Sequence, residues 1–181
     1  MISKNLIKAL SEQVNAEYYS AYLYHAMSAY AENAGFKGAA QWLFMQAREE
    51  MAHGVHMYQY ILDRGASPDF TAIKQPDSSF ASISEVFEKV LEHEKKVTKS
   101  VNSIATLAMK ESDHACYQFI IWYVNEQVEE EANAADIISK LQMIGNDKRA
   151  LLTLDNELAA RTYTNPFPAD IKLSSAANAA R

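Results

Sequence analysis

The residues Glu50-Met51-Ala52-His53 place a carboxylate and an imidazole one helical turn apart, and this pair constrains the fold more than any other feature of the chain. Three residues of an α-helix turn about 300°, so both side chains project from one face. A buried carboxylate without a partner is costly in the core of a bundle. The pair therefore predicts helices whose acids converge on a cation that neutralises them.

Five helices are predicted from the spacing of apolar residues. In four long segments these residues recur at steps of three and four, the period of one helix face, and a short helix over about 148–160 follows them. Serine caps and glycine stops set the limits of such helices. The residues expected to begin or end the four long helices are Ser3, Gly35, Gly38, Gly65, the capping box Ser82–Glu85, Ser112, Asp113, Gly145 and Asn146.

The connection over residues 66–81 is long for a compact domain. Pro68 and Pro76, each within a polar stretch, indicate irregular structure. At roughly 3.3 Å per residue this segment reaches about 53 Å, whereas a helix of about 28 residues is roughly 42 Å long. The connection can therefore run the full length of the bundle, and we expect the second and third helices to be parallel.

The length of the chain suits one domain. It has 181 residues and a mass of 20.3 kDa, so a sizeable core can form without disulfides or other staples. We expect the domain to span residues 1–165. The tail over residues 166–181 has little to bury and is predicted to be disordered.

The charge and the single cysteine narrow the class of protein. A formal net charge of −6 and a pI of about 5.4 argue against nucleic-acid and membrane binding and suit a protein that handles cations. Cys116 cannot form an internal disulfide, so we expect a cytoplasmic location. The sequence contains no apolar run of about 18 residues, so no transmembrane helix is predicted.

Each long helix carries polar residues at positions where its inward stripe calls for apolar ones. Taken singly, a glutamate is more often a solvated charge, and a histidine is more often a hydrogen-bonded core residue. Together they favour a metal site, because a metal-free bundle would leave its central acids unneutralised. The residues are Glu17 on the first helix, Glu50 and His53 on the second, Glu94 on the third, and Gln127 and Glu130 on the fourth.

These motifs identify a family. Over about residues 3–165 the chain resembles the bacterial non-haem ferritins, and the general rule for such carboxylate bundles is itself drawn from ferritin-like proteins. The resemblance implies an all-α, ferritin-like four-helix bundle with one long crossover and a short C-terminal fifth helix. The matching segments, in order along the chain, are Gln13–Tyr19, Arg48–His53, His93-Glu94 and Trp122–Glu131.

The resemblance implies a di-iron ferroxidase centre within each subunit. One iron would be held by Glu17, Glu50 and His53. The second would be held by Glu50, which bridges the two, with Glu94 and Glu130. Such carboxylates with one imidazole suit iron in both oxidation states.

Further roles follow from the same resemblance. Gln127 would hydrogen-bond beside the iron pair, and Tyr24 would stand next to the centre to donate an electron or to hold an oxygen species. A third iron site would use Glu49, Glu126, Glu129 and Glu130. On the fourth helix the three acids of this set share one stripe, because Glu130 lies within about 40° of Glu126.

The implied activity is oxidation of Fe(II) to Fe(III) by dioxygen or peroxide. The product would be stored as a mineral inside a hollow shell of twenty-four identical subunits. The chain would thus be an iron-storage protein and a ferroxidase, with iron as its metal.

Bacterioferritin is the nearest alternative. That family binds haem through a methionine, and Met51 occupies the corresponding position here. It also repeats Glu-x-x-His on the fourth helix, where this chain has Glu130 in place of the second histidine. We therefore disfavour haem binding and expect Met51 to pack in an interface or in the core.

Two other classes fit less well. A mini-ferritin that shields DNA should carry a basic tail and a site between subunits, whereas this chain is acidic and has all four ligand helices in one subunit. A rubrerythrin-type peroxide reductase needs an iron domain ligated by several cysteines, and this chain has one.

Overall fold

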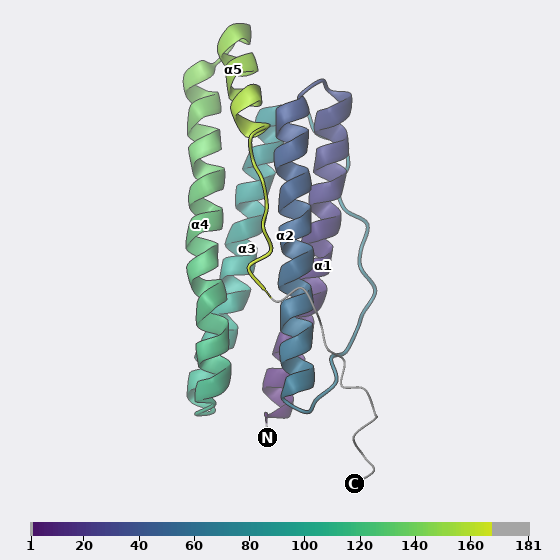
Figure 1. The fold of residues 1–181 in the computed structure, drawn as a ribbon, viewed down its shortest axis with the longest axis vertical. Helices are drawn as coiled ribbons and strands as arrows, with labels where there is room; N and C mark the ends of the chain where they lie inside the picture. The colour runs from purple at the N-terminus through teal and green to yellow at the C-terminus, as the bar shows by residue number, and fades with distance from the viewer. Residues whose placement is uncertain (1, 168–181) are drawn as a thin grey trace.

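Five α-helices make up most of the computed structural model, which describes residues 2–167 (Figure 1). The described residues contain no strand, so the predicted all-α class is confirmed. Residues 168–181, most of the predicted disordered tail, lie outside the described part. The helices are α1 (Lys4–Asn33), α2 (Lys37–Asp63), α3 (Ile83–Lys110), α4 (His114–Ile144) and α5 (Lys148–Leu158).

The helix limits follow the capping residues in the sequence. The Ser3 hydroxyl accepts from the amide of Leu6 at 3.1 Å and begins α1. Gly35 has a φ of +89° after the end of α1, a conformation that costs glycine little. The Ser82 hydroxyl accepts from Glu85, as predicted, but the Glu85 carboxylate accepts from Ala81 rather than from Ser82 itself.

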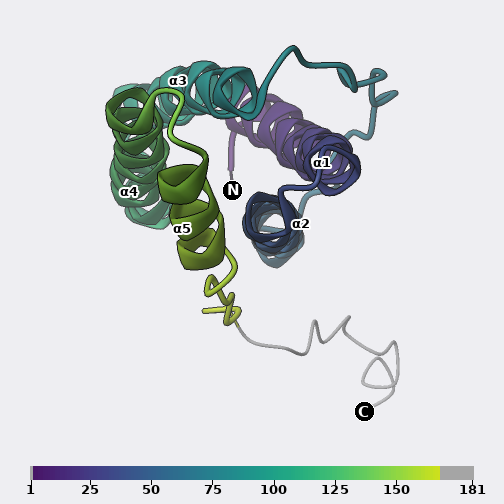
Figure 2. The same cartoon turned by 90° about the horizontal axis from the view of Figure 1, so that it is seen from above.

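The crossover between α2 and α3 is irregular throughout and climbs along the outer side of α1 (Figures 1 and 2). It returns the chain to the end of the bundle where α2 began, so α2 and α3 run parallel, as predicted. Hydrogen bonds to α1 hold it in place. Asn15 donates to the carbonyl of Asp69 at 2.8 Å and accepts from the amide of Thr71 at 2.9 Å.

The core consists of two apolar clusters separated by a polar layer. One cluster packs the end of the bundle near α5 and includes Met27, Leu43 and Phe87. The other packs the opposite end and includes Leu10 and Ile120. The layer between them holds the acids of all four long helices. Its buried polar residues are Gln13, Glu17, Gln46, Glu50, His53, Glu94, Gln127 and Glu130.

Helix α5 closes one end of the bundle and packs against α2. Phe36, at the N-cap position of α2, supplies no capping side chain. The Asp155 carboxylate of α5 takes that role, because it accepts from the amides of Gly38 and Ala39 at 3.0 and 2.9 Å. Gly38, which the sequence marks only as a helix start, also allows this contact: a Cβ there would lie 1.6 Å from the Asp155 carbonyl oxygen.

None of the helices in the described part combines the length and the apolar character that a membrane span requires.

The close packing of α5 on α2 yields a test of stability. Gly38→Ala should force α5 away from α2 and lower the free energy of unfolding by about 1–3 kcal/mol, the usual cost of overpacking. Urea unfolding followed by circular dichroism measures it. Lys37→Ala, at the exposed preceding position, is the control and should change stability by less than about 0.5 kcal/mol. Equal stabilities for the two variants would contradict the contact.

Candidate metal centre

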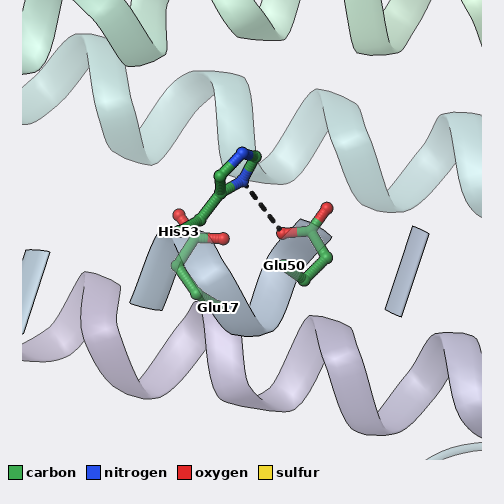
Figure 3. A group of neighbouring side chains, drawn as sticks. All are labelled: Glu17, Glu50 and His53. Carbon is green, nitrogen blue, oxygen red and sulfur yellow. Dashed lines mark ion pairs between the residues drawn. The ribbon is translucent and has the colours of Figure 1, made fainter. Parts of the chain in front are cut away.

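Glu17, Glu50 and His53 form a compact group in the polar layer, here called the inner group (Figure 3). One potential ligand atom from each lies within 4.8 Å of the others, and each residue is 2% exposed. Helix α1 supplies Glu17, and one turn of α2 supplies the other two. Figure 3 shows the side chains of Glu17, Glu50 and His53 reaching toward one another on the side of α2 that faces α3.

His53 contributes a nitrogen on each side of its ring. Nδ1 lies 3.6 Å from the Glu50 carboxylate. Nε2 is buried and has no hydrogen-bond partner among the described residues. A buried ring nitrogen without a partner is unusual in a finished core and is in keeping with a residue whose partner is a ligand.

Two buried glutamines support the inner group. The Gln13 amide donates to Glu17 at 2.9 Å. The Gln46 amide donates to Glu130 at 2.7 Å and reaches Glu50 at 3.4 Å. Each glutamine precedes its own glutamate by four residues, so the two share a helix face.

Glu94 faces the inner group from α3 and is held by two partners. The Tyr24 hydroxyl donates to its carboxylate, and the Gln127 amide donates to it at 3.1 Å. Tyr24 is fully buried, and burial beside the acids raises the pKa of its hydroxyl well above the usual value. The phenol therefore stays protonated and acts as a donor.

Glu130 completes the layer from α4. Its carboxylate is turned toward Gln46, and Glu94 is turned toward Tyr24, so these two do not gather with Glu50 as tightly as the inner group does. Each of these two carboxylates is held instead by a hydrogen bond from a neutral donor.

The electrostatics of the layer favour a cation. Burial is the largest cause that raises the pKa of Glu17, Glu50 and Glu130 well above the usual range, and negative neighbours add to it. Burial also raises the pKa of Glu94, while the bonds from Tyr24 and Gln127 hold it down. A multivalent cation would remove both causes, since it replaces lost hydration and neutralises the repulsion.

A second cluster, here called the outer group, consists of Glu49, His53 and Glu126. Their ligand atoms also lie within 4.8 Å of one another, and both acids are half-buried. Glu129, grouped with them by the sequence analysis, is exposed and does not join this cluster. Glu49 instead meets Arg161, whose guanidinium donates to its carboxylate at 2.6 Å.

His53 belongs to both groups, which limits how they can be filled. A neutral imidazole has one unprotonated nitrogen and offers a lone pair to one metal. A cation bound to one ring nitrogen therefore leaves the other nitrogen protonated, so the imidazole can serve only one of the two groups at a time. When the inner group holds the imidazole, the outer group would bind its own cation through carboxylates alone.

Met51 lies on the surface rather than in the core. It is 47% exposed and lines an apolar hollow of about 590 Å³ with Tyr18, Tyr22, His25 and Ile73. Packing of Met51 in the core, one of the two expectations for it, is therefore excluded by its position.

Comparison with known proteins places the chain in a family. The model of the ferritin-like domain matches residues 7–144. The bacterial non-heme ferritin of Staphylococcus aureus strain USA300 is 41% identical over 163 residues, which cover 90% of this chain and 98% of the relative, and that of Staphylococcus haemolyticus is 40% identical over the same shares. The chain belongs to the ferritin family.

Solved structures agree with this assignment. The open-pore ferritin of the archaeon Archaeoglobus fulgidus superposes with a TM-score of 0.88 at 46% identity, and the match covers 90% of this chain and all of that one. An engineered closed form of the same protein gives a TM-score of 0.89 at 45% identity. The ferritin-like four-helix bundle predicted from the sequence is thus confirmed.

Three polar contacts of this ferritin were missed by the sequence analysis. Gln13 and Gln46 could have been found, because each lies one helical turn before an acid of the inner group. Arg161 gave no such signal. It lies more than 100 residues from Glu49 in sequence, within a segment that has no periodic pattern.

The raised pKa values predict how the stability of the metal-free ferritin depends on pH. An acid whose pKa is higher in the folded chain holds its proton more tightly there. Its contribution to stability is full below the unfolded value of about 4.3 and is lost as pH rises toward the folded value. Glu50→Gln should remove part of this loss and stabilise the metal-free chain at pH 7.5 by about 1–3 kcal/mol.

Thermal unfolding between pH 4 and 8, in a chelating buffer, measures this effect. Glu88→Gln, on the exposed face of α3, is the matched control and should follow the wild-type curve. In the same buffer without the chelator, added Zn(II) should stabilise the wild type more than Glu50→Gln. If the unfolding temperature of Glu50→Gln followed that of the wild type in parallel at every pH, the raised pKa of buried Glu50 would be contradicted.

Proposed function

We propose that this ferritin oxidises Fe(II) at the inner group and the acids facing it, and passes the Fe(III) to a mineral store. Membership of the ferritin family supports iron storage as the general role. The observation that carries the oxidation step is the burial of two carboxylates and an imidazole within 4.8 Å of one another. Hard oxygen ligands with one imidazole are a donor set that accepts both Fe(II) and Fe(III).

The first iron would bind Glu17, Glu50 and His53. The second would bind on the far side of Glu50, with Glu94 and Glu130. Both acids now accept hydrogen bonds, from Tyr24 and Gln46, and a cation beside Glu50 would attract their carboxylates. Gln127 follows Glu94 through its amide and keeps that carboxylate aligned.

The chemistry requires two irons to act together. Each Fe(II) gives up one electron, and dioxygen takes up two electrons and two protons to become hydrogen peroxide. Where peroxide is the oxidant, it takes two electrons and two protons and yields two waters. A pair of irons bridged by one carboxylate supplies both electrons at one place.

Tyr24 stands beside this pair as a hydrogen-bond donor. Its hydroxyl is bonded to Glu94, so it orients the carboxylate that would hold the second iron. From the same position the phenol would supply one further electron. In either role the phenol must lie against the iron pair, and its complete burial supports this.

The remaining parts of the proposal concern transfer and storage. Glu49 and Glu126, which already lie together, would hold a third iron on its way to the store, with Glu129 and Glu130 as the further ligands that the family resemblance implies. We propose that twenty-four copies of the chain form the shell that encloses the mineral. The ferritins among its structural neighbours support assembly into a homo-oligomer.

Removal of the bridging ligand tests the oxidation step. Glu50→Ala should slow rapid Fe(II) oxidation by at least about 100-fold, since loss of even an outer partner of a metal ligand typically costs 10–100-fold. Stopped-flow absorbance after mixing with dioxygen measures the rate. Glu88→Ala should behave as wild type, and size-exclusion chromatography checks that the assembly persists. Rapid oxidation by Glu50→Ala would refute the assigned centre.

Tyr24→Phe removes the hydroxyl and keeps the aromatic ring, so it tests the hydroxyl alone. It should slow oxidation by about tenfold and leave Fe(II) affinity within about threefold, because the ligands stay and only the bond to Glu94 is lost. Tyr22→Phe, at a position 54% exposed on the same helix, is the control. An oxidation rate equal to that of the wild type would show that the Tyr24 hydroxyl has no role in the oxidation.

A further inference from the structure

Arg161 lies in the segment that follows α5, which runs back along the side of the bundle between α2 and α4 (Figure 1). Its guanidinium makes the ion pair with Glu49 and lies over the Trp42 ring, 4.3 Å from the centroid. The pair is largely shielded, since the two side chains are 17% and 14% exposed. It is therefore screened less by salt than a surface ion pair.

The segment stays against the metal centre beyond this pair. Phe167 stacks on His56 at 3.9 Å between ring centroids and meets Trp122 at 4.9 Å. Its ring also lies 6.1 Å from that of His53. The segment from Arg161 to Phe167 thus borders Glu49 and His53 of the outer group.

Two partners compete for the Glu49 carboxylate. It is one of the three residues of the outer group, and it is also the ion-pair partner of Arg161. No other lysine or arginine in the described residues pairs with an acid of either group. In the absence of a metal, the guanidinium is the positive charge that neutralises Glu49.

Solvent reaches this pair through a polar cavity of about 490 Å³. Glu49, Glu129 and Arg161 line it, together with Trp42 and Tyr163. A hydrated cation entering the cavity meets the Glu49 carboxylate and the guanidinium together. Two positive charges on one carboxylate repel each other, so the cation and Arg161 compete.

We propose that Arg161 sets the affinity of the outer group for divalent cations: its guanidinium holds Glu49 in the metal-free chain and gives way when a cation binds between Glu49 and Glu126. The inference rests on the proposed role of the outer group as a cation site. Arg161 would act on the outer group because it pairs with Glu49, an acid that belongs to that group alone.

The physical advantage is that the half-buried Glu49 carboxylate always has a positively charged partner. Loss of one partner from a shielded ion pair is costly, and either the guanidinium or the metal fills that role here. The cost of displacing Arg161 weakens cation binding at the outer group. Weak binding suits a site that releases iron onward rather than retaining it.

A purely structural role is the competing explanation. In that case the ion pair only fastens the segment after α5 to α2, and its loss would change stability without changing cation affinity. The two explanations differ in a measurement that does not involve oxidation. Zn(II) serves as the probe, since it is divalent, binds carboxylate and imidazole, and has no redox chemistry.

The experiment is isothermal titration calorimetry of the metal-free assembled ferritin with Zn(II). Arg161→Gln removes the charge and keeps a polar side chain, and Arg161→Lys keeps the charge. Arg149→Gln, an exposed arginine on α5, makes the same chemical change away from the site. Glu126→Gln identifies the binding event that belongs to the outer group.

Arg161→Gln should raise the affinity of the outer group for Zn(II) by about tenfold, because the charge-assisted bond to Glu49 no longer competes with the cation. Arg161→Lys and Arg149→Gln should stay within about threefold of wild type, and the inner event should not change in any of them. Suppose that Zn(II) binding at the outer group is lost in Glu126→Gln but has the same affinity in Arg161→Gln as in the wild type: this result would overturn the role of Arg161 alone. If neither the wild type nor Arg161→Gln binds Zn(II) at the outer group, the outer site itself would be overturned as well.

Discussion

The burial of several carboxylates close together is the constraint on which the rest of the structure depends. Four long helices each direct at least one acid into a layer that has an apolar cluster on either side. Those clusters hold the helices together while the layer remains unfavourable without a cation. Hydrogen bonds from Gln13, Gln46 and Gln127 reduce the cost, and protonation reduces it further. The centre of the bundle therefore favours a bound cation, which is the property a ferritin requires.

Much of this arrangement was predictable because the helix period fixes it. Glu50 and His53 share a face by their spacing alone, and Gly35, Gly65 and Gly145 marked helix ends that the structure confirms. The parallel course of α2 and α3 followed from the reach of the crossover. The orientation of Glu94 and Glu130 did not follow from the sequence, because it depends on neighbours contributed by other helices.

The parts that escaped prediction are long-range contacts made by residues without a periodic signal. Gly38 reads as a helix start, yet its lack of a side chain is what lets α5 approach and Asp155 cap α2. Arg161 follows the last helix and still reaches Glu49 near the middle of α2. Both contacts come from the C-terminal part of the chain. Helix α5 and the segment after it thus add contacts to α2, whereas the four long helices build the centre.

The most direct test of the account is anomalous X-ray diffraction at the iron absorption edge, from crystals loaded anaerobically with Fe(II). The account predicts two strong peaks within the polar layer of each chain. One should be bounded by Glu17, Glu50 and His53, and the other by Glu50, Glu94 and Glu130. Peaks confined to the surface, with none in the polar layer, would contradict it.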